Sequence, residues 1–353
     1  MKKVLFATSA LVLSAGFASA EVALSGDGRM GVVYDGNDAQ FGSRARVKFT
    51  LTGESDAGLS FGAAFRVDQE NYNANRFRSA ARGTAGAVWI SGTYGKLSMG
   101  DTLSASEAAI GDLYEIGYTD GTFVGDVEEI SYLTGDGENT DQGPNILYEY
   151  SINNFNLFLS ASDASDNDWP GATGSDNPYY DEEDDAFDPA DNDTDTDVAW
   201  SVAGSYNGEL ANGSWMVGLG YAKHDDAKEI TLGGEFKTGG FSVKGIIVDY
   251  DERGEFTLQI DDAPDFTLAL ADYEYDRTYG LSMAYEYQAW TFEGFWRRDE
   301  FEAITAGFDD EDFDTFGIGA EYDLGGGAVL AGAIADSDYA SDTVADFGIK
   351  FKF

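Results

Sequence analysis

Short segments in which apolar and polar residues alternate recur along the chain, and they restrict its fold class more than any other feature. The period of two is that of a β-strand, whose successive side chains point to opposite faces of a sheet. Sixteen such segments lie at 22–34, 43–53, 58–69, 83–93, 96–101, 145–152, 155–162, 196–206, 212–224, 228–237, 240–249, 277–287, 289–298, 313–322, 326–335 and 343–353. The series predicts an all-β protein.

The connections between these segments alternate in length. Short turns lie near 53–58, 93–96, 153–154, 207–212, 238–239, 288 and 323–325, and longer connections occupy 35–42, 70–82, 102–144, 163–195, 250–276, 299–312 and 336–342. Only the connection at 225–227 breaks this alternation. A transmembrane barrel has short turns at one rim and long loops at the other, whereas a soluble β-sandwich has no reason to sort its loops this way. We therefore predict a 16-stranded antiparallel transmembrane β-barrel over residues 21–353.

Strand parity places the charges of the first three segments. Arg44, Arg46 and Lys48 share one face of their segment, while Val47 and Phe49 share the other. A charge that faces hydrocarbon near the midplane costs about 2–4 kcal/mol, so the charged face must point into the barrel. The same parity puts the two further basic residues Arg29 and Arg66 on the lumen side.

The composition agrees with a barrel and excludes other classes. No segment after the N-terminus is long and apolar enough for a transmembrane helix. The net charge of -44 argues against nucleic-acid binding, which requires a basic surface. The strand pattern and the 24 Phe and 20 Tyr argue against disorder in spite of that charge.

Both ends of the chain carry export signals. Residues 1–20 combine two lysines, an apolar stretch and an Ala-Ser-Ala end, which predicts a cleaved signal peptide. The last ten residues alternate strictly and end on Phe353. An aromatic stripe at a free strand would invite aggregation in water, and it resembles the C-terminal signature of bacterial outer-membrane barrels. We expect the mature chain to lie in the outer membrane of a Gram-negative bacterium.

The third long connection, 102–144, is the longest and carries the candidate functional residues. A connection of this length without secondary structure of its own is usually functional or disordered. Its first half contains the acidic residues Glu107, Asp112, Glu115 and Asp120. Facing the basic lumen residues, they would create a transverse field that filters solutes by size and charge. The alternative is that these charges only solvate a wide polar lumen.

Several ordered stretches resemble the general porins of alphaproteobacteria such as Rhodobacter. The stretches are 21–32 at the mature N-terminus, 100–120 through Gly-Asp-Leu-Tyr-Glu-x-Gly-Tyr-Thr-Asp, 132–136, 322–328 and 344–353. The resemblance covers most of the chain and weakens at 163–195 and 250–276. It implies a homotrimer whose third loop folds into the lumen and narrows it between acidic loop residues and the basic wall.

The resemblance also implies calcium among the loop carboxylates, for which Asp112, Glu115 and Asp120 are the candidates. It implies no organic cofactor, and a channel for passive diffusion of ions and small hydrophilic solutes. The acidic stretch 176–197 is a second place where calcium is conceivable, but it lacks the pattern of an EF-hand, and a solvated loop explains it better.

Other functional classes have weaker support. The chain has no Cys and a single histidine, His224, so a conventional nucleophile pair would need His224 with a serine. A lone histidine at a strand end is more often a surface residue, and we expect no enzymatic activity. A non-conducting structural barrel is the third class, but it is typical of about eight strands, whereas sixteen leave an open channel.

Overall fold

A computed structural model describes residues 21–71, 77–78, 86–119, 128–134, 145–162, 198–224, 226–260, 269–339 and 343–353. The predicted signal peptide and the acidic stretch 176–197 lie outside these residues. Within them, no helix has the length and apolar character needed to cross a membrane.

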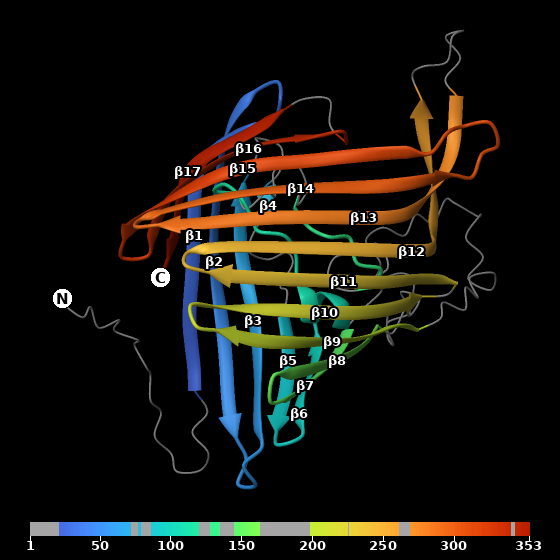
Figure 1. The fold of residues 1–353 in the computed structure, drawn as a ribbon. Helices are drawn as coiled ribbons and strands as arrows, with labels where there is room; N and C mark the ends of the chain where they lie inside the picture. Colours follow the sequence, from blue (N-terminus) through green and yellow to red (C-terminus); the bar gives the residue numbers. More distant parts are fainter. Residues whose placement is uncertain are drawn as a thin grey trace, which may run out of the picture.

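The described chain forms one antiparallel sheet and one short helix (Figure 1). The strands are β1 (Glu21–Tyr34), β2 (Ala39–Glu54), β3 (Ser60–Asn71), β4 (Phe77–Arg78), β5 (Gly86–Gly92), β6 (Gly95–Gly100), β7 (Asn145–Ile152), β8 (Phe155–Ser162), β9 (Ala199–Leu210), β10 (Gly213–His224), β11 (Ala227–Thr238), β12 (Phe241–Ile260), β13 (Ala269–Tyr287), β14 (Trp290–Ala303), β15 (Glu311–Gly325), β16 (Ala328–Ser337) and β17 (Val344–Lys352). The helix α1 (Ala105–Ile110) lies in the third long loop.

The sheet is closed. Apart from β4 and β5, strands that are neighbours along the chain pair with each other, and β1 also pairs with the last strand, β17. Because β4 and β5 both pair with β3, they share one position in the ring, so the 17 labelled strands make a barrel of sixteen. The predicted 16-stranded antiparallel barrel is confirmed.

The predicted ends of two strands are correct, and the predicted ends of other strands differ from the structure. The predictions 145–152 and 155–162 coincide with β7 and β8. The predicted connection 250–276 is wrong, because β12 continues to Ile260 and β13 begins at Ala269. This pairing has register shifts between Asp249 and Glu255, where the regular alternation that guides a sequence-based assignment is lost.

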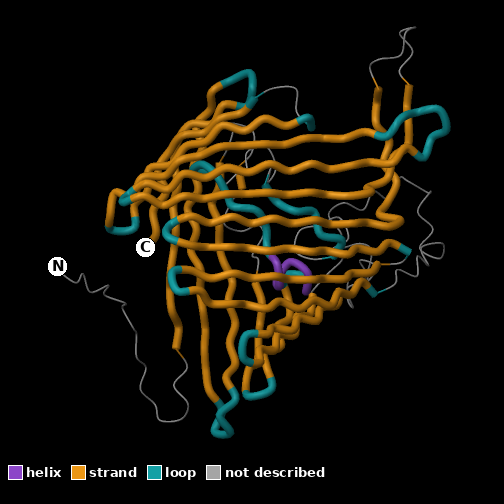
Figure 2. Tube along the Cα trace, in the orientation of Figure 1, coloured by secondary structure: helices purple, strands orange, loops and turns teal. Residues whose placement is uncertain are grey.

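Alternation sorts the side chains onto two faces, as predicted. In β13 the apolar residues Leu281, Met283 and Tyr285 are 39–47% exposed on the outer face, while Thr278 and Ser282, at positions of the opposite parity, are fully buried on the other. The buried face is the inner one, because the loop that contains α1 packs against it (Figure 2). An apolar outside and a polar inside are what a barrel in lipid requires.

Candidate functional site

The helix α1 begins and ends where the sequence provides caps. The Ser104 hydroxyl accepts a hydrogen bond from the Glu107 amide at 3.1 Å, and Gly111 ends the helix with a positive φ of 67°. A serine followed three residues later by a glutamate is a recognised helix start. The Ala105 amide then donates to Ser160 on β8 and Ser201 on β9, which fixes the helix to the wall at 3.0 and 2.8 Å.

The loop packs its apolar side chains onto inward-facing glycines of the barrel. Ile110 lies over Gly218 on β10 and Gly233 on β11, where an added Cβ would come within 2.7 and 2.3 Å of its side chain. Leu113 lies over Gly280 in the same way. These side chains join Ile246, Val248 and Phe295 of the wall in a small apolar core inside the barrel. The described loop segments 101–119 and 128–134 are therefore seated on the wall.

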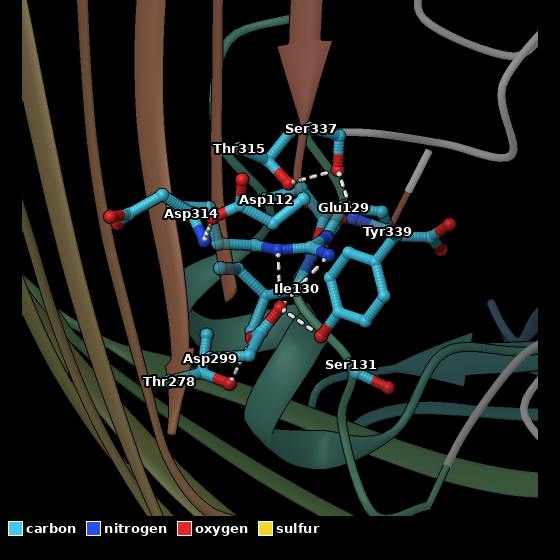
Figure 3. Close-up of polar contacts among 12 residues, drawn as sticks. Asp112, Glu129, Ile130, Ser131, Thr278, Asp299, Asp314, Thr315, Ser337 and Tyr339 are labelled. Carbon is cyan, nitrogen blue, oxygen red and sulfur yellow. Dashed lines mark hydrogen bonds and ion pairs between the residues drawn. The ribbon is translucent and has the colours of Figure 1, made fainter. Parts of the chain in front are cut away.

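The second loop segment is held by a buried polar network on β13, on β14 and at Tyr339, just beyond the end of β16 (Figure 3). Arg297 donates to the Glu129 carbonyl at 2.6 Å and forms an ion pair with Asp299 at 3.0 Å. Asp299, which is 2% exposed, also accepts hydrogen bonds from Thr278 at 2.6 Å and Tyr339 at 2.7 Å. A buried charge is tolerated only when it is paired and hydrogen-bonded, and this network satisfies that condition.

Two further wall residues hold the loop backbone next to this network. Arg253 donates to the carbonyl and hydroxyl oxygens of Ser131 at 2.6 and 2.8 Å, and its guanidinium lies over Tyr250 at 4.4 Å from the ring centre. The buried Glu229 accepts a hydrogen bond from the Leu133 amide at 2.5 Å. Backbone groups of the loop that would otherwise be buried without partners are thereby satisfied.

Two tyrosines of the loop add contacts within it and to the wall. Burial and the nearby carboxylate of Asp112 raise the pKa of Tyr132 well above its usual value, so its phenol stays protonated and donates to the Gly111 carbonyl at 3.0 Å. Burial and a hydrogen bond to Glu235 likewise raise the pKa of Tyr114. The Tyr114 phenol donates to that carboxylate at 2.9 Å.

The end of the first loop segment is fixed at β17 and β1. The Asp346 carboxylate accepts the amides of Tyr118 and Thr119 at 3.2 and 2.9 Å. Arg29 donates to the Thr119 carbonyl at 2.5 Å, and Lys350 donates to the Gly117 carbonyl at 3.1 Å. Of the five predicted wall residues, Arg29 thus has a structural contact with the loop and is only 3% exposed.

The other four predicted wall residues lie beside each other on the inner face of β2 and β3. Arg44 forms an ion pair with Asp27 at 3.0 Å. Arg46, Lys48 and Arg66 line a cavity of about 480 Å³, to which β17 adds Lys352, a residue that the sequence argument did not select. Lys48 and Arg66 face each other directly across the strand pair. With Lys350, seven of the 21 basic residues of the chain lie on four adjacent strands.

The predicted acidic residues have different surroundings. Glu107 is partly buried in the first turn of α1, and Glu115 is exposed. Asp112 accepts a hydrogen bond from the Ile130 amide at 3.0 Å and so ties the two loop segments together. Asp120 lies outside the described residues. The selection of these residues as a constriction stays a prediction.

The residues that position the loop were missed by the sequence argument. They include Asp299, Arg297, Glu229, Asp346 and Arg253, all on strands that pack against the loop. The available signal was their parity, because each is a charged residue on the inward face of its strand. A ring of sixteen strands is wide enough to leave an aqueous channel beside such a loop.

Comparisons with known proteins agree with this architecture. The family described as Gram-negative porin matches residues 7–342. A porin of Rhodobacter capsulatus is 39% identical over 343 residues, which cover 94% of this chain and 100% of the relative. A porin of Fuscovulum blasticum is 27% identical with the same coverage.

Solved structures give the same result. A porin structure refined at 1.8 Å has a TM-score of 0.66 and 34% identity, and it covers 94% of this chain and 100% of its own. A mutant of Rhodopseudomonas blastica porin, with a TM-score of 0.59 and 20% identity, shares the fold. The closed barrel, the polar interior and these relatives together show that the chain belongs to the Gram-negative porins, outer-membrane channels for the passive diffusion of ions and small hydrophilic solutes.

Proposed function

We propose that solutes cross this porin through a charged constriction between the inner loop and the basic wall of β17, β1, β2 and β3. The observation that carries the proposal is the concentration of Arg46, Lys48, Arg66 and Lys352 around an open cavity on one side of the lumen, with Arg44 beside them on β2. The loop is anchored on strands around the barrel, including β9 and β13, and brings Glu107, Asp112 and Glu115 into the same interior.

The electrostatics of such an arrangement follow from the low dielectric constant of the barrel wall. Opposed charges across a narrow aqueous gap produce a field that orders water and favours solutes with a matching dipole. The field is screened over about 8 Å at physiological ionic strength, so it acts only where the passage is narrow. Ion selectivity that changes with the wall charges, at constant loop position, is the expected sign of this mechanism.

We propose that the porin is a homotrimer whose contact face includes β16, β17, β1 and β2. The outer surface there has an apolar groove of about 640 Å³ lined by Met30, Val32, Phe41, Leu330, Phe347 and Ile349. On β12, β14 and β15 the run of outward apolar residues ends at a charged residue, which is Asp249, Arg298 and Asp314 respectively. At the corresponding ends of β1 and β2 the outward residues are the aromatic Tyr34 and Phe41. An uncharged border fits a face covered by protein rather than by lipid headgroups.

The mass of the folded protein in detergent tests whether it is a trimer. Mass determination in detergent should give three subunits, and Phe41→Lys should shift the protein to monomers. A monomeric wild-type protein would contradict the proposal. Arg298→Gln, on the lipid side, is the matched control and should leave the trimer intact.

Calcium among Asp112, Glu115 and Asp120 is a separate proposal that rests on the family resemblance. Within the described part of the chain, no three acidic or histidine side chains converge on one point. Asp112 already accepts the Ile130 amide, and Glu115 is exposed. Carboxylate oxygens are the ligands that calcium prefers. Removal of calcium should lower the melting temperature of the folded protein, and an unchanged value would reject the site.

We also propose that the protein has no catalytic activity. His224, the single histidine of the chain, is the last residue of β10, and a lone histidine at a strand end is more often a surface residue than a catalytic base. A lipid-hydrolysis assay on the folded protein should give no product above background, and turnover abolished by His224→Ala would overturn this expectation.

A further inference from the structure

The barrel has one junction that no turn or loop connects, the seam between β1 and β17. These are the first and last strands, and their pairing runs over eight residue pairs from Asp27–Lys352 to Tyr34–Ala345. On its other side β1 pairs with β2 over fourteen. Closing the ends of a long chain carries the largest loop-closure entropy in the molecule. Contacts that span this seam therefore matter more for closure than equal contacts elsewhere.

The side chain of Tyr118 lies across this seam. Gly31 of β1 and Gly348 of β17 face each other in the pairing, and the tyrosine ring covers both. A Cβ added to either glycine would lie 2.9 or 2.7 Å from a ring atom. Tyr118 is fully buried and packs with Val33 and Ala331. The two small residues leave the space that the ring fills.

Polar contacts of the neighbouring loop residues also join the two strands. Thr119 donates from its amide and its hydroxyl to Asp346 on β17, at 2.9 and 2.5 Å. The carbonyl of the same residue accepts a hydrogen bond from Arg29 on β1. Gly117 offers its carbonyl to Lys350 on β17. One residue of the loop is thus bonded to both sides of the seam.

We propose that Gly117-Tyr118-Thr119 is a strap that locks the closing seam of the barrel and, through the same contacts, fixes the loop at this end. Tyr118 supplies the apolar part, and Asp346 and Arg29 supply the polar part. Taken together, the three residues contact both β1 and β17. Barrel closure and loop position are then one cooperative unit, and a weakened strap affects both.

Two kinds of loop anchor should therefore differ in their effect on barrel closure. Asp346 holds the loop at the seam, whereas Glu229 on β11 holds it far from the seam, where both neighbouring strands are connected by turns or loops. Both are buried carboxylates that accept a loop amide. Asp346→Asn and Glu229→Gln are therefore matched changes, and only the first should weaken barrel closure.

The test compares unfolding rates in urea with and without a cross-link at the seam. Loss of the heat-modifiable folded band on a gel measures the rate. Met30 and Ile349 are directly opposite each other on the outer face, and the chain has no Cys of its own. Opposite residues of an antiparallel pair have Cα atoms about 4.5–5.5 Å apart, within the range for a disulfide. Met30→Cys with Ile349→Cys supplies the cross-linked background.

Without the cross-link, Asp346→Asn should unfold about tenfold faster than the parent, and Glu229→Gln should change the rate by less than about threefold. In the oxidised cysteine background the effect of Asp346→Asn should disappear, while that of Glu229→Gln should persist. If Asp346→Asn does not fold, Thr119→Val replaces it, with Thr119→Ser as the variant that keeps the hydroxyl. An Asp346 or Thr119 effect that the cross-link does not reduce would overturn the proposal.

Discussion

Ile110 of the inner loop lies directly on Gly233 of β11, so closely that a Cβ added to the glycine would be 2.3 Å from Ile110 Cγ2. Gly218 of β10 meets the same side chain. The absence of side chains on the wall is what lets the loop lie flat against it. The width of the open path therefore depends on how small these wall residues are.

Gly233→Ala should lower the single-channel conductance, because the added methyl group must push Ile110 and its loop toward the open side of the lumen. The next residue provides a matched control. A Cβ on Gly234 would have its nearest atom, the Met216 carbonyl oxygen, at 3.4 Å. Gly234→Ala should leave the conductance unchanged, and equal conductance of both variants and the wild type would refute this packing argument.

Asp299→Asn should destabilise the barrel by about 3 kcal/mol, because it leaves the buried Arg297 without its counter-charge. Asp314→Asn removes the partner of Arg298, but that pair is about one-third exposed and should contribute little. The free energy of unfolding in urea, measured by tryptophan fluorescence, distinguishes the two. Similar losses in both variants would show that burial of the Arg297–Asp299 pair does not matter.

Gly117→Ala should be more harmful than Gly58→Ala, although both glycines have the same φ of 78°. The shared backbone conformation costs any L-residue about 1–2 kcal/mol. At Gly117 the new Cβ would also lie 2.4 Å from the Asp346 carboxylate, whereas at Gly58 it would meet nothing within 4 Å. Melting temperatures of the two variants should differ accordingly, and equal values would mean that the strap tolerates displacement.

Arg44→Gln combined with Arg46→Gln should shift the reversal potential in a salt gradient toward cation selectivity, because two positive charges leave the inner wall. Arg298→Gln removes one positive charge from the outer face of β14 and serves as the control outside the lumen. Its reversal potential should equal that of the wild type. An unshifted potential in the double variant would show that these arginines do not line the conducting path.

Much of the fold was predictable because a barrel strand is a local pattern. The alternation of Arg44, Arg46 and Lys48 with apolar neighbours is sufficient to define a strand and its two faces. The prediction failed at 250–276, where the register shifts near Arg253 remove that alternation although the strands continue.

The candidate site was predictable only in part. Parity placed the basic residues on the inner face, but it could not show that Arg29 holds the Thr119 carbonyl or that Asp112 accepts the Ile130 amide. Those contacts join residues far apart in the sequence, and no local pattern specifies them. The apolar residues Ile246 and Val248 break the polar rule for the lumen, and the loop that covers them explains why.

Conductance of the purified, folded protein in a planar bilayer shows whether the barrel is a water-filled channel. We expect stepwise, long-lived channels with ohmic current, and a reversal potential in a salt gradient that depends on the wall arginines. If protein that a heat-modifiability assay shows to be folded gave no current in the bilayer, this result would contradict a water-filled channel.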